Sequence, residues 1–309
     1  MFQGMHYVYE VYKEMSFSKA ARNLFISQPS LSAAVKKAEA QIGFPIFDRS
    51  SNHIQLTELG KEYIRSIEII MDVENGFQNY INDMKELKSG TIAIGGTNLF
   101  ASYVLPPLLS RFTEQYPQVQ VNLVEATTSQ LTDRLFSGSL DLLIDNKSMD
   151  PAIYQKSFFC EEHLLLAVPI RLSVNEKMKN YALTASDIRE NRHLNSRIPP
   201  VPLENFQEES FLLLKSGNDP RTRADRICHN AHVIPKIKLE LDQQITAYNL
   251  SRYGMGISFC SDTLVRHVPD AGGLVYYKLN HQDALRDVNF YYKRNRYMPR
   301  IVSTFLDMI

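Results

Sequence analysis

Cysteine is scarce in this sequence, and long apolar runs are missing. The three cysteines (Cys160, Cys228 and Cys260) lie far apart and form no metal-ligand spacing, which is typical of a reduced, cytoplasmic protein and argues against a disulfide framework. No run approaches the roughly 18 to 20 apolar residues of a membrane span, so we expect no membrane partner. Residues 1–15 are amphipathic and contain acids, unlike a signal peptide.

An excess of charge is also lacking. Lysine plus arginine and aspartate plus glutamate both number 34, so the formal net charge is zero. A nucleic-acid partner therefore has to be inferred from local charge. Residues 1–65 lean slightly basic, with eight Lys or Arg against six Asp or Glu, and this is weak evidence by itself.

Motifs for cofactors and catalysis are missing as well. Gly95 and Gly96 end a candidate strand, but the remaining glycine of a dinucleotide-binding fingerprint is not there. His229 and His232 have metal-like spacing, yet no Cys or carboxylate pattern accompanies them, and we expect both on the surface. No nucleophile–base pattern is evident. The sequence therefore predicts neither an enzyme nor a bound cofactor or metal.

A short helix with a polar and basic face is present between residues 27 and 43. Ser27 is a good N-cap, and Pro29 fits only a first helical turn, where its missing N–H costs nothing. Gly43 is a suitable C-cap. The buried face is predicted from the apolar spacing of Leu31, Val35 and Ala38. Gln28, Ser30, Ser32, Lys36 and Lys37 are left to face outward.

Two shorter helices and a pair of strands surround this helix. Tyr9, Val11, Tyr12 and Met15 supply the apolar face of a first helix, and residues 19–24 form a second one, capped by a serine. Helices joined in this way form a helix-turn-helix, whose last helix normally enters a DNA major groove. Residues 45–47 and 54–56 then predict short strands that flank residues 49–52. This arrangement indicates a wing.

A long helix is predicted from Thr57 to about Lys88. Its apolar residues alternate at spacings of three and four over several heptads, which favours pairing of this helix between two chains. The alternative is a helix that lies on its own domain, but the adjoining sequence offers little else to cover the apolar side chains. The residues expected in the pairing are Tyr63, Ile67, Ile70, Phe77, Ile81 and Met84.

After Gly90, strands alternate with helices. TIAIGG (91–96), DLLID (141–145) and HLLLAV (163–168) are candidate strands among helical segments. Such alternation predicts parallel α/β sheets. Over residues 90–309 it indicates two α/β lobes.

Residues 16–60 resemble the winged helix-turn-helix of LysR-type transcriptional regulators. The matching residues keep one register without gaps through the helices, the wing and the start of the long helix. Further along, Leu105-Pro106, GSLDLLI (138–144) and GMGI (254–257) stand where that family has similar motifs. The N-terminal matches are Ser16, Phe17, Ala20, Ala21, Leu24, Ser27, Gln28, Ser32, Glu39, Gly43, Phe47, Arg49, Leu56, Thr57 and Gly60.

The resemblance implies the fold class and the domains. We expect an α/β protein with a winged helix-turn-helix at residues 1–60 and a dimerising linker helix at 61–89. An effector-binding domain at 90–309 would resemble periplasmic binding proteins of type 2. Its first lobe is expected at about 90–161 and 268–309, and its second lobe at about 162–267.

The DNA contacts are predicted on the short polar helix and the wing. Glutamine pairs well with adenine and serine with several base edges, whereas lysine and arginine suit phosphates. The family often has arginine or glutamine where Ala33 and Ala34 stand, and a second wing arginine where Asn52 stands. Weaker, more salt-sensitive binding to a single site follows from these departures. The predicted DNA-binding residues are Ser27, Gln28, Pro29, Ser30, Ser32, Lys36, Lys37 and Arg49.

A small-molecule site is predicted at strand-to-helix junctions. Ligands of open α/β sheets bind outside the carboxyl ends of the strands, and helix N-termini there favour an anion such as a carboxylate. Thr97 and Thr127 also stand where the resembling proteins line their effector pocket, and Arg221 follows the junction of the second lobe. Ordinary helix capping is the alternative. The expected effector residues are Thr97, Asn98, Thr127, Thr128, Lys215 and Ser216.

Together these patterns predict a cytoplasmic, DNA-binding transcriptional regulator of LysR type. Its expected partners are double-stranded DNA, a small anionic effector, further copies in a homodimer or homotetramer, and RNA polymerase. Two alternatives stay open: a DNA-binding protein with no effector response, and a receptor or enzyme with the same two-lobed fold.

Overall fold

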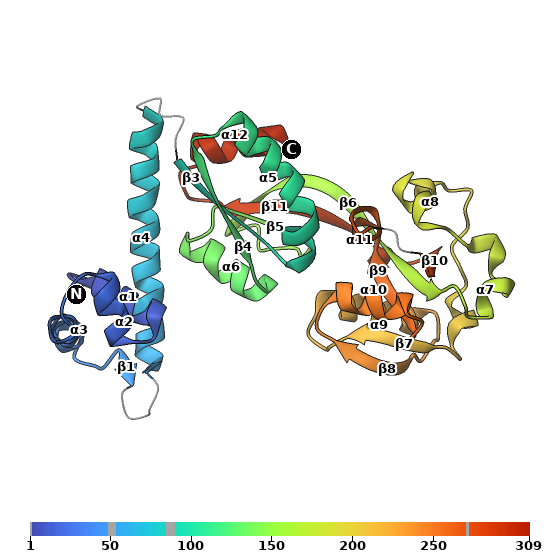
Figure 1. Cartoon of the computed structure of the whole chain (residues 1–309), viewed down its shortest axis with the longest axis horizontal. Coiled ribbons are helices and arrows are strands. Elements are labelled where there is room, and N and C mark those ends of the chain that lie inside the picture. Colours follow the sequence, from blue (N-terminus) through green and yellow to red (C-terminus); the bar gives the residue numbers. More distant parts are fainter. Residues whose placement is uncertain (1, 49–53, 85–89, 270–271) are drawn as a thin grey trace. The chain divides into compact units, whose positions relative to one another are not determined.

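The computed structural model describes residues 2–48, 54–84, 90–269 and 272–309 (Figure 1). The chain forms two compact units. One holds residues 1–87 with 133–140 and 295–300, and the other holds the remaining residues. Within the described ranges, no helix is both long and apolar enough to cross a membrane.

The N-terminal unit begins with three helices, two short strands and the long helix α4. The predicted helix-turn-helix and strand pair are present, although the tip between the strands, residues 49–53, lies outside the described residues. The first helices pack through a common core with Val8, Ala20, Leu31 and Val35, all of them buried. The elements are α1 (Met5–Glu14), α2 (Phe17–Asn23), α3 (Gln28–Ile42), β1 (Phe47–Asp48), β2 (Gln55–Leu56) and α4 (Glu58–Met84).

The apolar side chains of α4 divide into two sets, which corrects the sequence prediction. Tyr63 and Ile67, expected between two chains, are buried in the core of the helix-turn-helix. Phe77, which was expected in the pairing, is 65% exposed, and it forms an apolar stripe with Val73 (68% exposed) and Ile69 (37%), two residues that were not expected there. The prediction failed at Tyr63 and Ile67, and Ile70 also packs against this core, because the domain itself covers the start of the helix.

Lobe I is a sheet flanked by helices, and it belongs to the second unit except for residues 133–140 and 295–300. β3 runs parallel to β4 and β5, and β11 closes the sheet antiparallel to β5. Its elements are β3 (Gly90–Gly96), η1 (Phe100–Val104), α5 (Leu105–Gln115), β4 (Val119–Glu125), α6 (Thr128–Ser137), β5 (Leu142–Asp145), β11 (Leu285–Lys293) and α12 (Arg300–Met308).

Lobe II is a second α/β layer. β7 runs parallel to both β8 and β9, and its core includes Phe206, Phe211, Ile257 and Tyr277. Its elements are α7 (Val174–Lys177), η2 (Lys179–Tyr181), α8 (Ala185–Arg189), η3 (Arg192–Leu194), η4 (Leu203–Phe206), β7 (Ser210–Leu214), α9 (Asp219–Asn230), β8 (Lys236–Leu241), α10 (Gln244–Arg252), β9 (Ile257–Ser261), α11 (Asp262–His267), β10 (Leu274–Lys278) and η5 (Gln282–Ala284).

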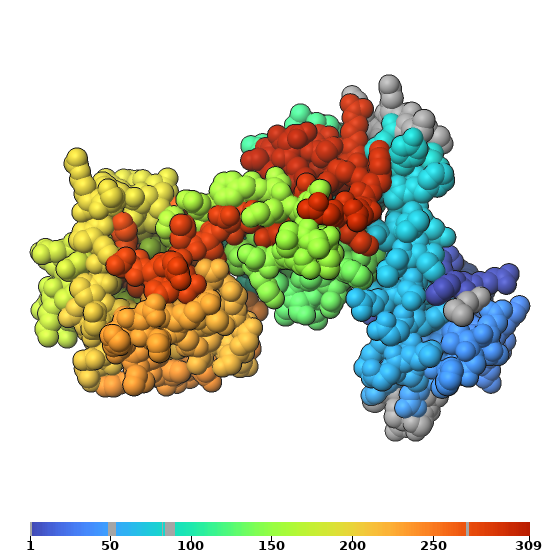
Figure 2. Space-filling view, turned by 180° about the vertical axis from the view of Figure 1, so that it is seen from behind, coloured from blue at the N-terminus to red at the C-terminus, as the bar shows by residue number. Residues whose placement is uncertain are grey.

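One long strand, β6 (Tyr154–Pro169), belongs to both lobes. Its first part pairs with β11 of lobe I and its last part with β9 and β10 of lobe II. The partner changes at His163, which pairs with Leu285, while Leu164 pairs with Ser261. A register shift opposite residues 158–160 marks a bulge in the β6–β11 ladder. Figure 2 shows the two lobes joined by these strands, in yellow-green and red.

The second lobe boundary differs from the prediction. Residues 268–278 were expected in lobe I, but β10 pairs with the lobe II part of β6, from Leu274 opposite Pro169 to Lys278 opposite Leu165. Tyr276 is buried in lobe II beside Leu183 and Tyr248. The chain therefore returns to lobe I only after Lys278. The sequence prediction placed this boundary too early because local sequence does not show which distant strands pair.

Candidate functional site

Helix α3 is held at both ends by the predicted caps. The Ser27 hydroxyl accepts a hydrogen bond from the Ser30 backbone N–H at 3.3 Å and lies 2.7 Å from the Ser30 hydroxyl. Pro29 lies in the first turn, and Gly43 ends the helix at φ 86, a left-handed conformation that glycine adopts without strain. The helix start is therefore rigid, with the hydroxyls of two predicted contact residues tied to each other.

The outward face of α3 carries most of the predicted DNA contacts. Ser32 is half-buried, and Ala33 lies exposed among the polar residues. Lys36 and Lys37 make no ion pair with any residue that the structure describes. Arg49 and Asn52 fall outside the described residues. The exposed predicted residues are Ser27, Gln28, Pro29, Ser30, Lys36 and Lys37.

Three further residues of the family match support the helix and the strand pair. The Glu39 carboxylate accepts hydrogen bonds from the backbone N–H groups of Ile46 (3.0 Å) and Phe47 (3.3 Å). The Thr57 hydroxyl donates to the Pro45 carbonyl at 2.8 Å and accepts from the Gly60 N–H at 2.9 Å. A Cβ on Gly60 would lie 2.1 Å from the Ile46 carbonyl oxygen, so only glycine fits there. These residues fix the base of the wing against α3 and α4.

A cleft of about 670 Å³ separates the two lobes of the second unit. Thr97, Asn98, Thr127 and Thr128 of lobe I line it, as the sequence predicted. Across from them, lobe II contributes the first turns of α9 and α10. Lys215 and Ser216 do not line the cleft, although Gly217 and the residues after it do.

Two hydrogen bonds order the polar groups on the lobe I wall. Thr128 Oγ1 donates to Asp145 Oδ2, and Asn98 Nδ2 donates to Glu125 Oε1, both at 2.8 Å. Burial raises the pKa of Asp145 above its usual range, although hydrogen bonds from the Lys147 backbone and from Thr128 lower it in part. The Thr128 hydroxyl therefore holds a buried acid, and its backbone N–H at the start of α6 is the group left for a ligand.

The basic side chains near the cleft are mostly paired. Lys215 Nζ lies 2.9 Å from Asp242 Oδ2, and Arg221 contacts Asp225 and Glu240. Each of these basic groups is therefore engaged by an acid of its own lobe, and Lys215 pairs with Asp242, which lines the cleft. The lobe I wall offers Lys147, which is exposed.

Arg286 also lines the cleft, and no sequence pattern pointed to it. It lies in β11, with Nε 2.6 Å from Glu162 Oε2 and Nη1 3.0 Å from Asp219 Oδ2. Glu162 is fully buried and also accepts from Asn146 at 2.9 Å. Asp145 was missed too, but its place at the carboxyl end of a buried strand was a usable signal. No comparable signal marked Arg286.

The three cysteines are poorly suited to thiolate chemistry. Burial raises the pKa of Cys160 and of Cys228 to about 12, and it also raises the pKa of the fully buried Cys260. A thiol must lose its proton to react, so these side chains act as small apolar groups.

Family comparisons agree with this architecture at both ends of the chain. Residues 85–309 match the LysR substrate binding domain, and residues 2–61 match the bacterial regulatory helix-turn-helix protein, lysR family. The chain belongs to the LysR family of transcriptional regulators. It is thus a DNA-binding regulator with an effector-binding domain, not an enzyme, and the fold class predicted from the sequence is confirmed.

Related regulators are similar in sequence to this chain over nearly its full length. The regulator YcgK of Bacillus subtilis (strain 168), described as uncharacterized, is 28% identical over 98% of this chain and 92% of its own. A probable RuBisCO transcriptional regulator of Gracilaria tenuistipitata var. liui is 25% identical over 96% and 91%.

Solved structures share the fold of the regulator. A full-length OxyR variant from Pseudomonas aeruginosa superposes with a TM-score of 0.73 at 21% identity, over 100% of this chain and 94% of that one. Full-length CbnR in complex with its target DNA has a TM-score of 0.66 at 16% identity, over 100% and 98%. At these identities the likeness concerns the fold alone.

Proposed function

We propose that this LysR-family regulator reads its operator with the first turns of α3 and responds to a small effector with an anionic group, bound between the lobes. The observation that supports DNA reading most directly is the outward face of α3, where a capped helix start exposes Gln28 and Ser30 ahead of Lys36 and Lys37. The first turns of a recognition helix dock closest to the base edges, and basic groups farther along meet phosphates.

Substitutions on α3 test this part of the proposal. Gln28→Ala should lower affinity for the operator about 5- to 150-fold, the 1–3 kcal/mol of one base-specific pair, while binding to unrelated DNA changes little. Lys36→Ala should weaken binding to all sequences alike and reduce the slope of log K against log salt concentration by about one. Fluorescence anisotropy with operator and scrambled duplexes at several salt concentrations measures both effects.

Lys177→Ala is the matched control, because it removes an equally exposed lysine from lobe II. It should leave affinity and salt slope unchanged. Equal losses on operator and scrambled DNA for Gln28→Ala would contradict its assignment to the bases.

The effector proposal rests on two helix starts that face the same cleft. Asn98 and Thr128 begin helical turns on the lobe I wall, and first-turn N–H groups lack partners within their own helix. Such groups favour a carboxylate or similar anion. Lys147 on the same wall adds positive charge. Glu125, Asp219 and Asp242 each already pair with an amide or a basic group, and their carboxylates can also accept hydrogen bonds from other groups of the effector.

Thermal shift of the full-length protein with acetate, succinate and citrate tests the anion site. We expect at least one carboxylate to raise the unfolding temperature, and Thr97→Ala to weaken that ligand roughly 10- to 100-fold, the worth of a hydrogen bond to a charged group. Thr91→Ala, an exposed change on β3 outside the cleft, should behave as the parent protein. An unchanged shift in Thr97→Ala would remove Thr97 from the site.

The exposed stripe of α4 supports assembly into dimers or tetramers. Ile69, Val73 and Phe77 recur every four residues on one helix face, as expected for pairing between helices. An assembly would present two copies of α3 to adjacent half-sites, which compensates for the few polar groups around Ala33. RNA polymerase as a partner and a cytoplasmic location stay predictions of the sequence.

A further inference from the structure

Two histidines and an aspartate from distant parts of the sequence meet beside the point where β6 changes partners. His163 lies in β6, His193 in η3, and Asp262 begins α11. Asp262 Oδ2 is 2.9 Å from His193 Nε2 and 3.5 Å from His163 Nδ1. The side chains of His193 and Asp262 are 1% exposed.

The three side chains have the composition and spacing of a metal site. In tetrahedral zinc sites the metal–ligand distances are about 2.0–2.2 Å, which sets ligand atoms roughly 3.4 Å apart. The two measured distances to Asp262 lie on either side of that value, and all three ligand atoms fall within 4.8 Å of one another. Among the described residues, this is the one group of three His, Cys, Asp or Glu side chains that meets this condition. Imidazole pairs favour zinc and its neighbours over magnesium or calcium.

A guanidinium lies on the open side of the cluster. Arg266 Nη2 is 2.8 Å from Asp262 Oδ2 and 3.4 Å from His193 Nε2. A divalent ion and this group would repel each other, so binding requires Arg266 to turn away. The Arg266 side chain is 30% exposed, and its Nε has no hydrogen-bond partner among the described residues. Its contacts with the cluster are therefore made through Nη2.

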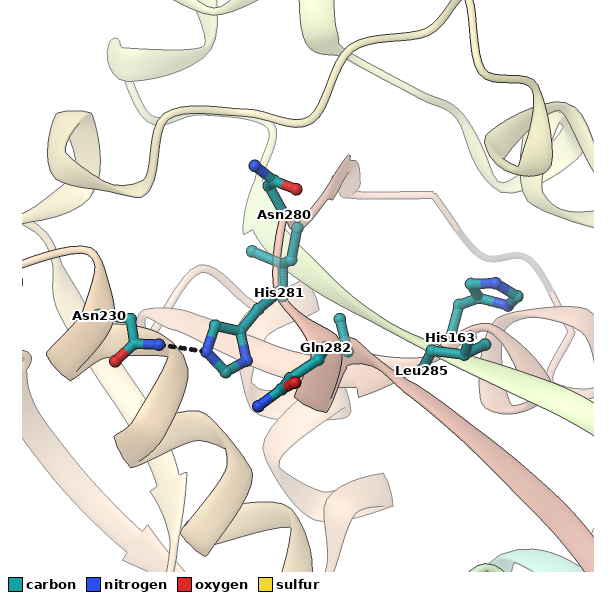
Figure 3. Close-up of a pocket in the computed structure, with 8 residues that line it drawn as sticks. His163, Asn230, Asn280, His281, Gln282 and Leu285 are labelled. Carbon is teal, nitrogen blue, oxygen red and sulfur yellow. Dashed lines mark hydrogen bonds between the residues drawn. The ribbon is translucent and has the colours of Figure 1, made fainter.

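A surface pocket borders the cluster at His163. It has a volume of about 530 Å³ and is lined by His163, Asn230, residues 279–282, Ala284 and Leu285 (Figure 3). His163 lies at one end of this pocket, and Asn230 and His281, 2.6 Å apart, lie at the other. The His163 side chain is 29% exposed, while its Nδ1 is buried and has no hydrogen-bond partner that the structure describes. The pocket therefore reaches one residue of the cluster, His163, through the exposed part of its side chain, while Nδ1 itself lies buried.

We propose that His163, His193 and Asp262 form a binding site for a divalent transition-metal ion of the zinc class, which displaces the Arg266 guanidinium. Water entering from the pocket would complete the tetrahedron, as in zinc sites with three protein ligands. Because His163 lies where β6 passes from lobe I to lobe II, the ion would tie α11 and η3 to the crossover strand. The site is separate from the effector cleft and does not depend on the effector proposal.

Titration of the chelator-treated, full-length protein with Zn²⁺ in a calorimeter, and with Co²⁺ followed by visible absorption, tests the proposal. We expect one ion per chain at this site and the intense bands of tetrahedral Co²⁺. His163→Ala should weaken binding by more than about 100-fold, since loss of even an outer-shell partner costs 10- to 100-fold. His281→Ala, at the other end of the same pocket, should bind as the parent protein does.

Arg266→Ala distinguishes metal binding from a merely structural network. If the guanidinium competes with the ion, its removal should tighten Zn²⁺ and Co²⁺ binding; if the network only stabilises the fold, the variant should gain nothing. Unchanged binding in His163→Ala, or unchanged or weaker binding in Arg266→Ala, would overturn the proposal. Loss of the tetrahedral bands in His281→Ala would do so too, because the ion would then lie in the pocket and not at Asp262.

Discussion

Arg286→Met should lower the free energy of unfolding of the two-lobed unit by about 3–5 kcal/mol, the cost of leaving a buried charge without its partner. Glu162 is fully buried, and Arg286 Nε is its 2.6 Å cationic partner. In the variant, the Glu162 carboxylate would keep its hydrogen bond from the Asn146 amide but would lose its cationic partner. The Asp219 carboxylate would keep a cationic partner, because Arg223 Nε also contacts it at 2.8 Å. Urea unfolding followed by circular dichroism measures the loss.

A double variant separates the lost charge pair from lost packing. Glu162→Leu together with Arg286→Met removes both charges and leaves apolar groups of similar size, so most of the stability should return. Lys156→Met is the matched control, since Lys156 forms an exposed pair with Asp287 at 3.7 Å, for which we expect a change of at most about 1 kcal/mol. A loss below about 1 kcal/mol in Arg286→Met would show that the pair is not a main support of the cleft.

Phe77→Asp should halve the mass of the assembly and weaken operator binding by about 10²- to 10⁴-fold, the range gained when two sites bind as one. Phe77 is 65% exposed on α4, in line with Val73, and a carboxylate buried between two such stripes would have no partner. Light scattering after gel filtration gives the mass, and anisotropy gives the affinity.

Asn75→Asp serves as the control for Phe77→Asp. It places the same charge on the same helix, two residues away and therefore on the opposite face, where Asn75 is exposed. Mass and affinity should stay as in the parent protein. A Phe77→Asp variant with the parent mass would contradict pairing through this stripe.

Much of the N-terminal unit could be predicted from sequence because its signals are local. A serine cap, a proline in the first turn and a C-terminal glycine predicted α3, and the structure begins it at Gln28 and ends it at Ile42. The apolar spacing of Leu31, Val35 and Ala38 gave the correct buried face. On α4 the same spacing misled at Tyr63 and Ile67, because periodicity shows which side chains need cover and not what covers them.

The sites of the second unit were only partly predictable. Strand-to-helix junctions predicted four residues that line the cleft, since the carboxyl ends of parallel strands share one edge. The prediction that Lys215 lines the cleft was wrong. Its ammonium pairs with Asp242, 27 residues along the chain, and sequence spacing does not show such a contact. The grouping of His163, His193 and Asp262, and the pairing of Arg286 with Glu162, depend on tertiary contacts across larger separations, for which sequence spacing carries no signal.

The shared strand β6 has a mechanical consequence for any opening of the cleft. Because one continuous backbone is hydrogen-bonded into both sheets, the lobes cannot slide past each other without breaking ladder bonds on one side. Rotation of one lobe about the shared strands is compatible with these ladder bonds. The bulge opposite residues 158–160 is a point where the hydrogen-bond ladder is already irregular. Under the proposed effector response, the bending stiffness of the paired strands β6 and β11 would therefore set how much binding free energy the effector needs to move one lobe against the other.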